Sequence, residues 1–161
     1  MIEMSVSKMT LEIVPADITE LDTVAALFDQ YRVFYGYLSN LPEVRDFLFD
    51  RMSRQEALIF IAREAFEEGD AKPVGFMLLY PSFSSLALGP ILYLNDLFVV
   101  PTERRKGIAQ EMVAHAKALA REFGYSKIQL ETATTNDPAK SLYESLGYVK
   151  EEQFDRYYLT V

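Results

Sequence analysis

The sequence predicts an α/β fold, with one domain over residues 1–161. We expect a mixed, mostly antiparallel central sheet of six to seven strands, flanked by about four helices. Two observations predict this fold. Short apolar segments of strand length alternate with longer segments whose apolar residues recur at helical spacing. In addition, half of the residues are apolar and no linker, repeat or low-complexity tract divides the chain, so one sizeable core can form.

The first half of the chain predicts one strand, two helices and a hairpin. Asp17, with Glu20 three residues later, forms a capping-box pattern, and the apolar residues after it recur at helical spacing up to Tyr35. Pro42 is suited to the first turn of a second helix. A polar loop at residues 67–70 lies between two compact apolar runs, which is typical of a hairpin. The strands expected here are residues 11–14, 57–62 and 74–80.

The second half predicts a long amphipathic helix and a short one. Gly124 is suited to end the long helix, whose apolar stripe is expected to comprise Ile108, Met112, Ala116, Leu119, Ala120 and Phe123. The short helix begins at Asp137 and ends before Gly147. The remaining expected elements are a loop at residues 81–90, strands at 92–100 and 127–133, and a final hairpin over 148–161.

Composition narrows the classes of function. The chain has no cysteine and one histidine, so it cannot form disulfides, thiolate metal sites or a multi-histidine centre, and we expect no metal. Its 24 acidic and 16 basic residues give a net charge of −8, which disfavours nucleic acid as a partner. No segment has the pattern of a signal peptide or the length to span a bilayer. We therefore expect a cytoplasmic protein without a membrane partner.

A basic, glycine-containing turn joins the 92–100 strand to the long helix. Such a turn directs several backbone N–H groups and the positive end of a helix dipole at one spot, which suits a diphosphate. It lacks the Gly-Lys-Ser/Thr ending of a P-loop and the G-x-G-x-x-G of a dinucleotide fold. The alternative is an ordinary helix N-terminus with solvated basic residues. The residues expected to bind the diphosphate are Arg104, Arg105, Lys106, Gly107, Ile108 and Ala109.

Two motifs resemble signatures of the GNAT superfamily of N-acetyltransferases. Arg104, Gly107 and Ala109 match its acyl-CoA-binding signature, Q/R-x-x-G-x-G/A. A second segment resembles N-x-x-A-x-x-x-Y-x-x-x-G-[FY], with Asn136, Ala139, Tyr143, Gly147 and Tyr148 on the fixed positions. The resemblance covers nearly the whole chain. It implies the acyl-CoA N-acyltransferase fold, with acetyl-CoA (coenzyme A) as co-substrate and no metal.

Within the superfamily, residues 93–99 most resemble the polyamine and small-amine branch (spermidine/spermine N-acetyltransferase-like), whose pattern is Y-L-E-D-x-F-V. Asn95 stands where that branch has Glu, which weakens the case for a polyamine. The expected reaction moves an acetyl group from acetyl-CoA to a primary amine of a small molecule, by direct attack in a ternary complex. The acceptor can be a polyamine, an amino-acid-like molecule or another amine. The alternatives are a protein or peptide N-acetyltransferase and a non-catalytic acyl-CoA-binding regulatory module. The resemblance also implies a homodimer, to which the C-terminal hairpin could contribute.

The resemblance assigns roles to further residues. Main-chain groups of Leu97, Phe98 and Val99 would bind the pantetheine arm and the acetyl carbonyl, with this strand splayed from residues 127–133. Asn136 would hold the arm from the other side. Tyr143 would protonate the departing thiolate, and the chemistry is suitable because a phenol has a pKa of about 10 and a thiol of about 8.5. The alternative is that Tyr143 merely packs in the core.

The acceptor site is expected around Asp96, because a carboxylate in an apolar strand requires a reason. Asp96 would bind the amine or accept its proton; the alternative is a buried Asp paired to a local N–H or hydroxyl. Since side chains alternate along a strand, Asn95 and Asp96 should face opposite ways. Tyr31 and Tyr35 are expected to line the acceptor site, where aromatic faces bind cations, with core packing as the alternative. Arg32 could bind an acceptor's carboxylate.

Overall fold

The computed structural model describes residues 9–67 and 69–161. Residues 1–8, where no leader was expected, and Glu68 of the predicted 67–70 loop lie outside the described residues. The chain divides into two compact units, residues 1–130 and 131–161, and each is described by itself. The single domain expected from the sequence stays a prediction.

The first unit is built on a five-stranded sheet in the order β1-β2-β3-β4-β5. The first four strands pair antiparallel with their neighbours, and β5 pairs parallel with β4. The mixed, mostly antiparallel α/β sheet is therefore confirmed, whereas the predicted six to seven strands are wrong. The strands are β1 (Met9–Pro15), β2 (Leu58–Phe66), β3 (Lys72–Ser84), β4 (Gly89–Val99) and β5 (Ile128–Leu130).

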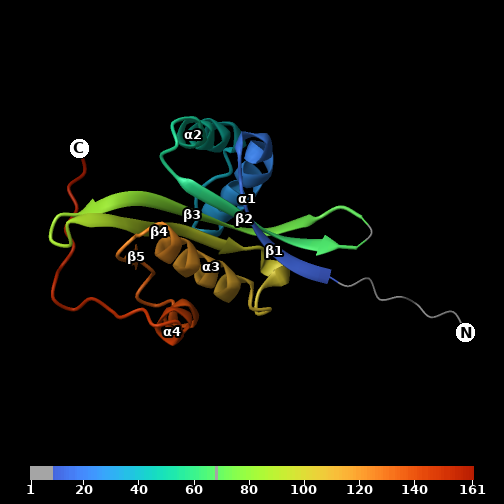
Figure 1. The fold of residues 1–161 in the computed structure, drawn as a ribbon. Coiled ribbons are helices and arrows are strands. Elements are labelled where there is room, and N and C mark those ends of the chain that lie inside the picture. The colour runs from blue at the N-terminus through green and yellow to red at the C-terminus, as the bar shows by residue number, and fades with distance from the viewer. Residues whose placement is uncertain (1–8, 68) are drawn as a thin grey trace, which may run out of the picture. The chain divides into compact units, whose positions relative to one another are not determined.

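Helices cover both faces of this sheet, with α1 and α2 on one side and α3 on the other (Figure 1). Each helix begins near its predicted start. Two short 3-10 turns, η1 and η2, precede α1 and α3. No helix in the described part of the chain is long and apolar enough to cross a membrane. The bounds are η1 (Ile18–Glu20), α1 (Leu21–Phe34), α2 (Leu41–Ser53), η2 (Pro101–Glu103) and α3 (Ile108–Glu122).

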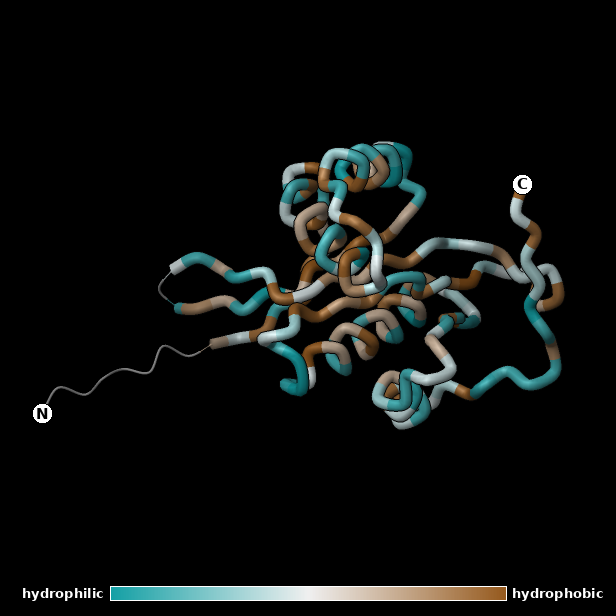
Figure 2. The backbone as a smooth tube through the Cα atoms, turned by 180° about the vertical axis from the view of Figure 1, so that it is seen from behind, coloured by the Kyte–Doolittle hydropathy of each residue, from teal (hydrophilic) through white to brown (hydrophobic). Residues whose placement is uncertain are grey.

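The core lies between the helices and the middle of the sheet, where hydrophobic residues run along the strands in Figure 2. On the α1 and α2 side, Phe28 packs against the fully buried Phe76, with ring centroids 5.4 Å apart. On the other side, the predicted apolar stripe of α3 is buried or half-buried up to Ala120, whereas Phe123, also predicted to lie on it, is 64% exposed at the C-cap of the helix. Gly124 follows with a φ of +75°. The buried residues of α3 are Ile108, Met112, Val113, Ala116 and Ala120.

The β3–β4 hairpin is longer than predicted. Residues 81–90 were expected to be a loop, yet Pro81 pairs with Leu92 and Ser84 with Gly89. Only residues 85–88 form the turn. Two antiparallel strands can extend beyond the sheet because each satisfies the other's backbone groups, so this segment needs no apolar run.

The second unit contains α4 (Asp137–Ser145), which was predicted, and Gly147 follows it with a φ of +92°. The hairpin predicted over residues 148–161 is wrong, because these residues form no strand. Their aromatic side chains Phe154, Tyr157 and Tyr158 are exposed. A lone hairpin is marginally stable in water, so alternation of apolar residues is not enough without a sheet edge to pair with. The predicted 127–133 strand is likewise reduced to β5, since its pairing ends at Leu130.

Candidate active site

The turn before α3 has the geometry of an anion-binding site. Gly107 is the N-cap of α3 with a φ of +81°, and Arg105 has a φ of +65°. The first backbone bond of the helix runs from Glu111 N–H to the Gly107 carbonyl, at 3.1 Å, so the N–H groups of residues 108–110 precede it. A Cβ placed on Gly107 would meet no atom within 4 Å, so the space above the turn is open to a ligand. These residues fit the diphosphate of acetyl-CoA.

The basic side chains of this turn are not equivalent. Arg104 turns back to β4: its Nε donates to the Val99 carbonyl at 3.0 Å, and its guanidinium lies 4.6 Å from the ring centroid of Phe34. Lys106 donates to Glu103 at 2.5 Å. The sequence singled out Arg104 for its charge but did not single out Glu103. The available signal was one acidic residue directly before a run of basic residues.

β4 leaves β5 halfway along its length. Its pairing with β5 ends at Leu94 and Leu130 in the described residues, while Leu97, Phe98 and Val99 continue to pair with β3. The β5-facing edge of the second half of β4 therefore has no paired strand in residues 9–67 and 69–130. Within the first unit, this edge leaves main-chain groups for a ligand to bind, and the splay from residues 127–133 that the resemblance implied stays a prediction.

Asp96 is buried in this part of β4, with 6% of its surface exposed. The β3–β4 register shifts here, since Leu78 pairs with Asp96 but Leu79 pairs with Leu94, so Asn95 is the extra residue of a β-bulge. Asn95 is exposed whereas Asp96 is buried, and that the two side chains face opposite ways stays a prediction. At the bulge, Asn95 Nδ2 donates to Asp96 Oδ2 at 3.0 Å.

The surroundings of Asp96 shift its ionisation in opposing directions. Burial raises the pKa of this carboxyl above its usual range, opposed by hydrogen bonds from Asn95 and from the Tyr31 hydroxyl. Tyr80, half-buried on β3, has its pKa raised by burial first and by the Asp96 charge second. The Tyr31 hydroxyl is therefore the hydrogen-bond partner that the alternative interpretation of Asp96 predicted. Tyr80 also lies near Asp96, although the sequence analysis did not single it out.

The two tyrosines expected in the acceptor site differ. Tyr31 is half-buried, and its ring centroid lies 5.7 Å from Phe76 and 6.0 Å from Phe98, both at edge-on angles. Its ring thus packs against the core while its hydroxyl bonds to Asp96. Tyr35 is 55% exposed and lies edge-on to Tyr31 at 4.9 Å. The structure therefore brings Tyr31, Tyr35 and Asp96 into one contiguous group.

The other two predicted residues lie on α4, in the second unit. Asn136 is the N-cap, and its side chain accepts from the Ala139 N–H at 3.3 Å. Tyr143 follows about two helical turns later, on the same side of the helix. Its ring centroid lies 5.7 Å from that of Tyr148. Asn136 therefore has a structural role as the cap of α4, in addition to the role in ligand binding that the motif implies.

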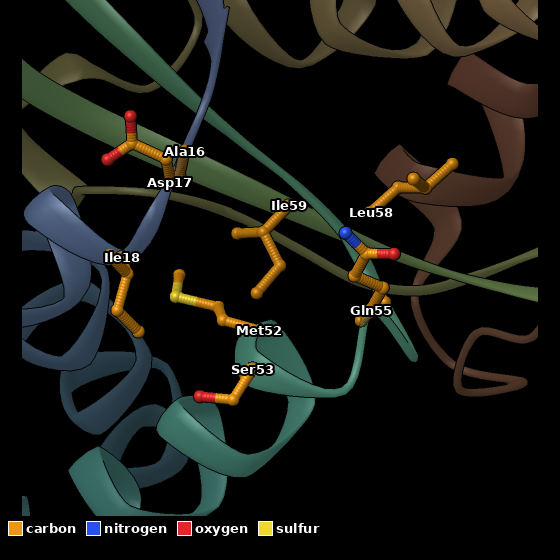
Figure 3. Close-up of a pocket in the computed structure, with 9 residues that line it drawn as sticks. Ala16, Asp17, Ile18, Met52, Ser53, Gln55, Leu58 and Ile59 are labelled. Carbon is orange, nitrogen blue, oxygen red and sulfur yellow. The ribbon is translucent and has the colours of Figure 1, made fainter.

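A pocket of about 610 Å³ lies elsewhere in the first unit and contains none of the predicted site residues (Figure 3). Its one carboxylate, Asp17, accepts hydrogen bonds from Thr19, which lower the pKa of that carboxyl. Because the Asp17 carboxylate already caps η1, this pocket is not the candidate active site. The lining residues are Ala16, Asp17, Ile18, Met52, Ser53, Gln55, Ala57, Leu58 and Ile59.

Comparison with known proteins identifies the family. The model of the acetyltransferase (GNAT) family matches residues 24–148. YhfO of Bacillus subtilis (strain 168), an uncharacterized N-acetyltransferase, is 39% identical over 146 residues, which cover 91% of this chain and 95% of YhfO. A probable acetyltransferase of known crystal structure is 38% identical in sequence to this chain, with a TM-score of 0.84. The match covers 93% of this chain and 97% of that one. A predicted acetyltransferase of Clostridium acetobutylicum, solved with acetyl-CoA, shares the fold at a TM-score of 0.71 and 16% identity, over 92% and 96% of the two chains. The chain belongs to the GNAT acetyltransferase family and is an acetyl-CoA-dependent N-acetyltransferase.

Proposed function

We propose that this enzyme transfers the acetyl group to the primary amine of a small molecule, by direct attack in a ternary complex. The observation that carries the proposal is Asp96: a buried carboxylate beside the point where β4 leaves β5, with the phenols of Tyr31 and Tyr80 near it. A carboxylate among aromatic rings suits an alkylammonium group, which both features attract.

Acetyl-CoA would lie along the open edge of β4. The N–H groups at the start of α3 would bind its diphosphate, and the main chain of Leu97, Phe98 and Val99 would bind the pantetheine arm and the acetyl carbonyl. In this proposal Asn136 contacts the arm from the other side. The support comes from the left-handed turn at Gly107 and from the unpaired edge of β4.

Acetyl-CoA supplies a thioester carbonyl carbon, which the neutral amine attacks to form the C–N bond as the C–S bond breaks. An alkylammonium with a pKa of about 10.4 must first lose a proton. Asp96 binds the ammonium and accepts or relays that proton, while the hydrogen bonds from Asn95 and Tyr31 hold the carboxylate in place. Tyr143 gives its proton to the departing thiolate. Because the chain has no cysteine, we propose no acetyl-enzyme intermediate.

The bulge bears on the acceptor's chemistry. Asn95 stands where the polyamine pattern has Glu, and its amide donates to Asp96 instead of adding a second negative charge. One carboxylate at the bulge suits one cationic amine, so we propose a monoamine or amino-acid-like acceptor ahead of a polyamine. The net charge of −8 also favours approach of a cation. We further propose a cytoplasmic location and a homodimer. Light scattering on the purified protein would test the dimer, and cell fractionation would test the location.

The test is turnover. The purified protein is incubated with acetyl-CoA and a panel of monoamines, amino acids, diamines, aminoglycosides and peptides, and thiol release is followed. We expect release with small amines and none above background with peptides. A mass shift on peptides alone would favour a protein acceptor, and tight coenzyme A binding without any turnover would favour a regulatory module.

A further inference from the structure

We infer that Glu103 is a positioning residue that holds the diphosphate-binding turn in its binding conformation before acetyl-CoA arrives. Glu103 ends η2 and is 7% exposed, although it lies in a turn at the surface. Its Oε2 accepts from Lys106 Nζ at 2.5 Å, and its Oε1 accepts from Lys72 Nζ at 3.2 Å. We call the group Lys72–Glu103–Lys106 the Glu103 bridge.

The Glu103 bridge ties the turn to the sheet. Lys72 is the first residue of β3 and pairs with Glu64 on β2, itself buried. Lys106 directly precedes Gly107, the N-cap of α3. A side chain held at residue 106 restricts the peptide that leads into the first N–H groups of the helix. The two lysines lower the pKa of Glu103 to about 2, so the bridge is ionised throughout the physiological range.

The turn is also anchored from its other side, because Arg104 donates to the Val99 carbonyl. Two of the three consecutive basic residues are therefore already engaged. Arg105, with a left-handed backbone and an exposed side chain, makes no hydrogen bond or ion pair in the described part of the chain. Arg105 is thus the basic side chain of the turn that can turn to the phosphate groups without breaking an existing contact.

If the Glu103 bridge orders the turn before acetyl-CoA binds, its loss should affect the binding of acetyl-CoA and not the rate of the chemical step. A turn ordered in advance spares the ligand the loss of backbone entropy on binding. The benefit is equal in the ground state and the transition state, so it changes KM and leaves kcat unchanged. Glu103→Gln should therefore raise the Kd for coenzyme A and the KM for acetyl-CoA about tenfold, which corresponds to ~1.4 kcal/mol. The kcat and the KM for the acceptor should stay within about twofold.

Three measurements test the inference. Calorimetry gives the Kd for coenzyme A, steady-state kinetics give the split between KM and kcat, and hydrogen exchange of the ligand-free protein reports amide protection at residues 105–110. In Glu103→Gln these amides should exchange faster. Lys72→Met should give a smaller effect in the same direction, and the double variant should resemble Glu103→Gln because Lys72 acts through Glu103. Glu122→Gln, the same charge change at the far end of α3, is the matched control and should change nothing.

An unchanged Kd, a tighter Kd from the released Lys106, or a fall in kcat at constant KM would each overturn the inference. If Glu103→Gln does not fold, Lys72→Met alone decides between these outcomes, since that lysine is half exposed. The inference rests on acetyl-CoA binding, not on the acceptor. Failure of the wild-type protein to bind coenzyme A would therefore refute the proposed cofactor site, whereas binding without any effect of Glu103→Gln would refute only the Glu103 bridge.

Discussion

Gly75 on β3 offers a direct test of the packing under the cofactor site. It lies opposite Val99 of β4. A Cβ at this position would lie 2.5 Å from the Phe98 carbonyl oxygen, 3.3 Å from Met112 Cε and 3.4 Å from Val99 Cα. The Met112 side chain can move, but the closest atom belongs to the backbone, so Gly75→Ala must displace β4. Gly75 is not among the glycines with positive φ, so the cost is steric and not conformational.

Overpacking of a core costs about 1–3 kcal/mol, and displacement of a central strand should bring Gly75→Ala to about 3 kcal/mol. For a chain of this length each kcal/mol lowers Tm by roughly 2–4 °C, so we expect a fall of about 6–12 °C. The displaced segment is the one proposed to bind the pantetheine arm. The Kd for coenzyme A should therefore rise about tenfold, or ~1.4 kcal/mol.

The assay is urea and thermal unfolding, with calorimetry for coenzyme A. Gly89→Ala is the matched control: it lies at the start of β4, and its Cβ would meet only the Ala87 carbonyl, at an ordinary 3.8 Å. Its unfolding free energy should stay within about 0.5 kcal/mol of wild type. The reasoning is refuted if the two variants have the same Tm, or if Gly75→Ala unfolds early yet binds coenzyme A with wild-type affinity.

Three other variants test the proposed roles. Tyr143→Phe should lower kcat by about 10²-fold or more in steady-state assays, because it removes the acid for the thiolate, and an unchanged kcat would contradict that role. Asp96→Asn should lower kcat/KM for cationic amines by about 10²-fold, from loss of the charge that binds and deprotonates the ammonium. Asp96 also predicts a pH dependence: its pKa is raised in the folded state, so its stabilising contribution is present at low pH and is lost as pH rises from 3.8 through the raised value. Urea unfolding should show wild type losing stability relative to Asp96→Asn over that range, and parallel curves would count against it. Gly107→Ala should cost about 1–2 kcal/mol through its left-handed φ of +81° and weaken coenzyme A binding in calorimetry, whereas an unaltered affinity would mean that no ligand approaches there.

The elements that the sequence predicted correctly depend on local chemistry. The turn before α3, the stripe from Ile108 to Ala120 and the helix after Asn136 each follow from capping residues, glycines and apolar spacing within one segment. Among the strand pairings, the β2–β3 hairpin was predicted, because two apolar runs flank a short polar loop. The family signatures lie in these same local segments.

The register of the strand pairs and the hydrogen-bond partners of the buried charges could not be predicted, because they depend on residues far apart in the chain. The bulge at Asn95 arises from pairing with β3, and at this bulge the Asn95 amide donates to Asp96. The hairpin expected over residues 148–161 has suitable alternation but no paired edge in the structure.

The sequence by itself determined the family, the helix that begins at a left-handed glycine, and the residues whose chemistry suits acetyl transfer. Only the tertiary structure decided which charged side chains already have a hydrogen-bond or ion-pair partner within the protein. Glu103 meets Lys72 across 31 positions of the chain, and Tyr31 of α1 meets Asp96 of β4. The physical reason is that a backbone turn is specified by neighbouring residues, whereas the burial and pairing of a charge are specified by whatever the fold brings beside it.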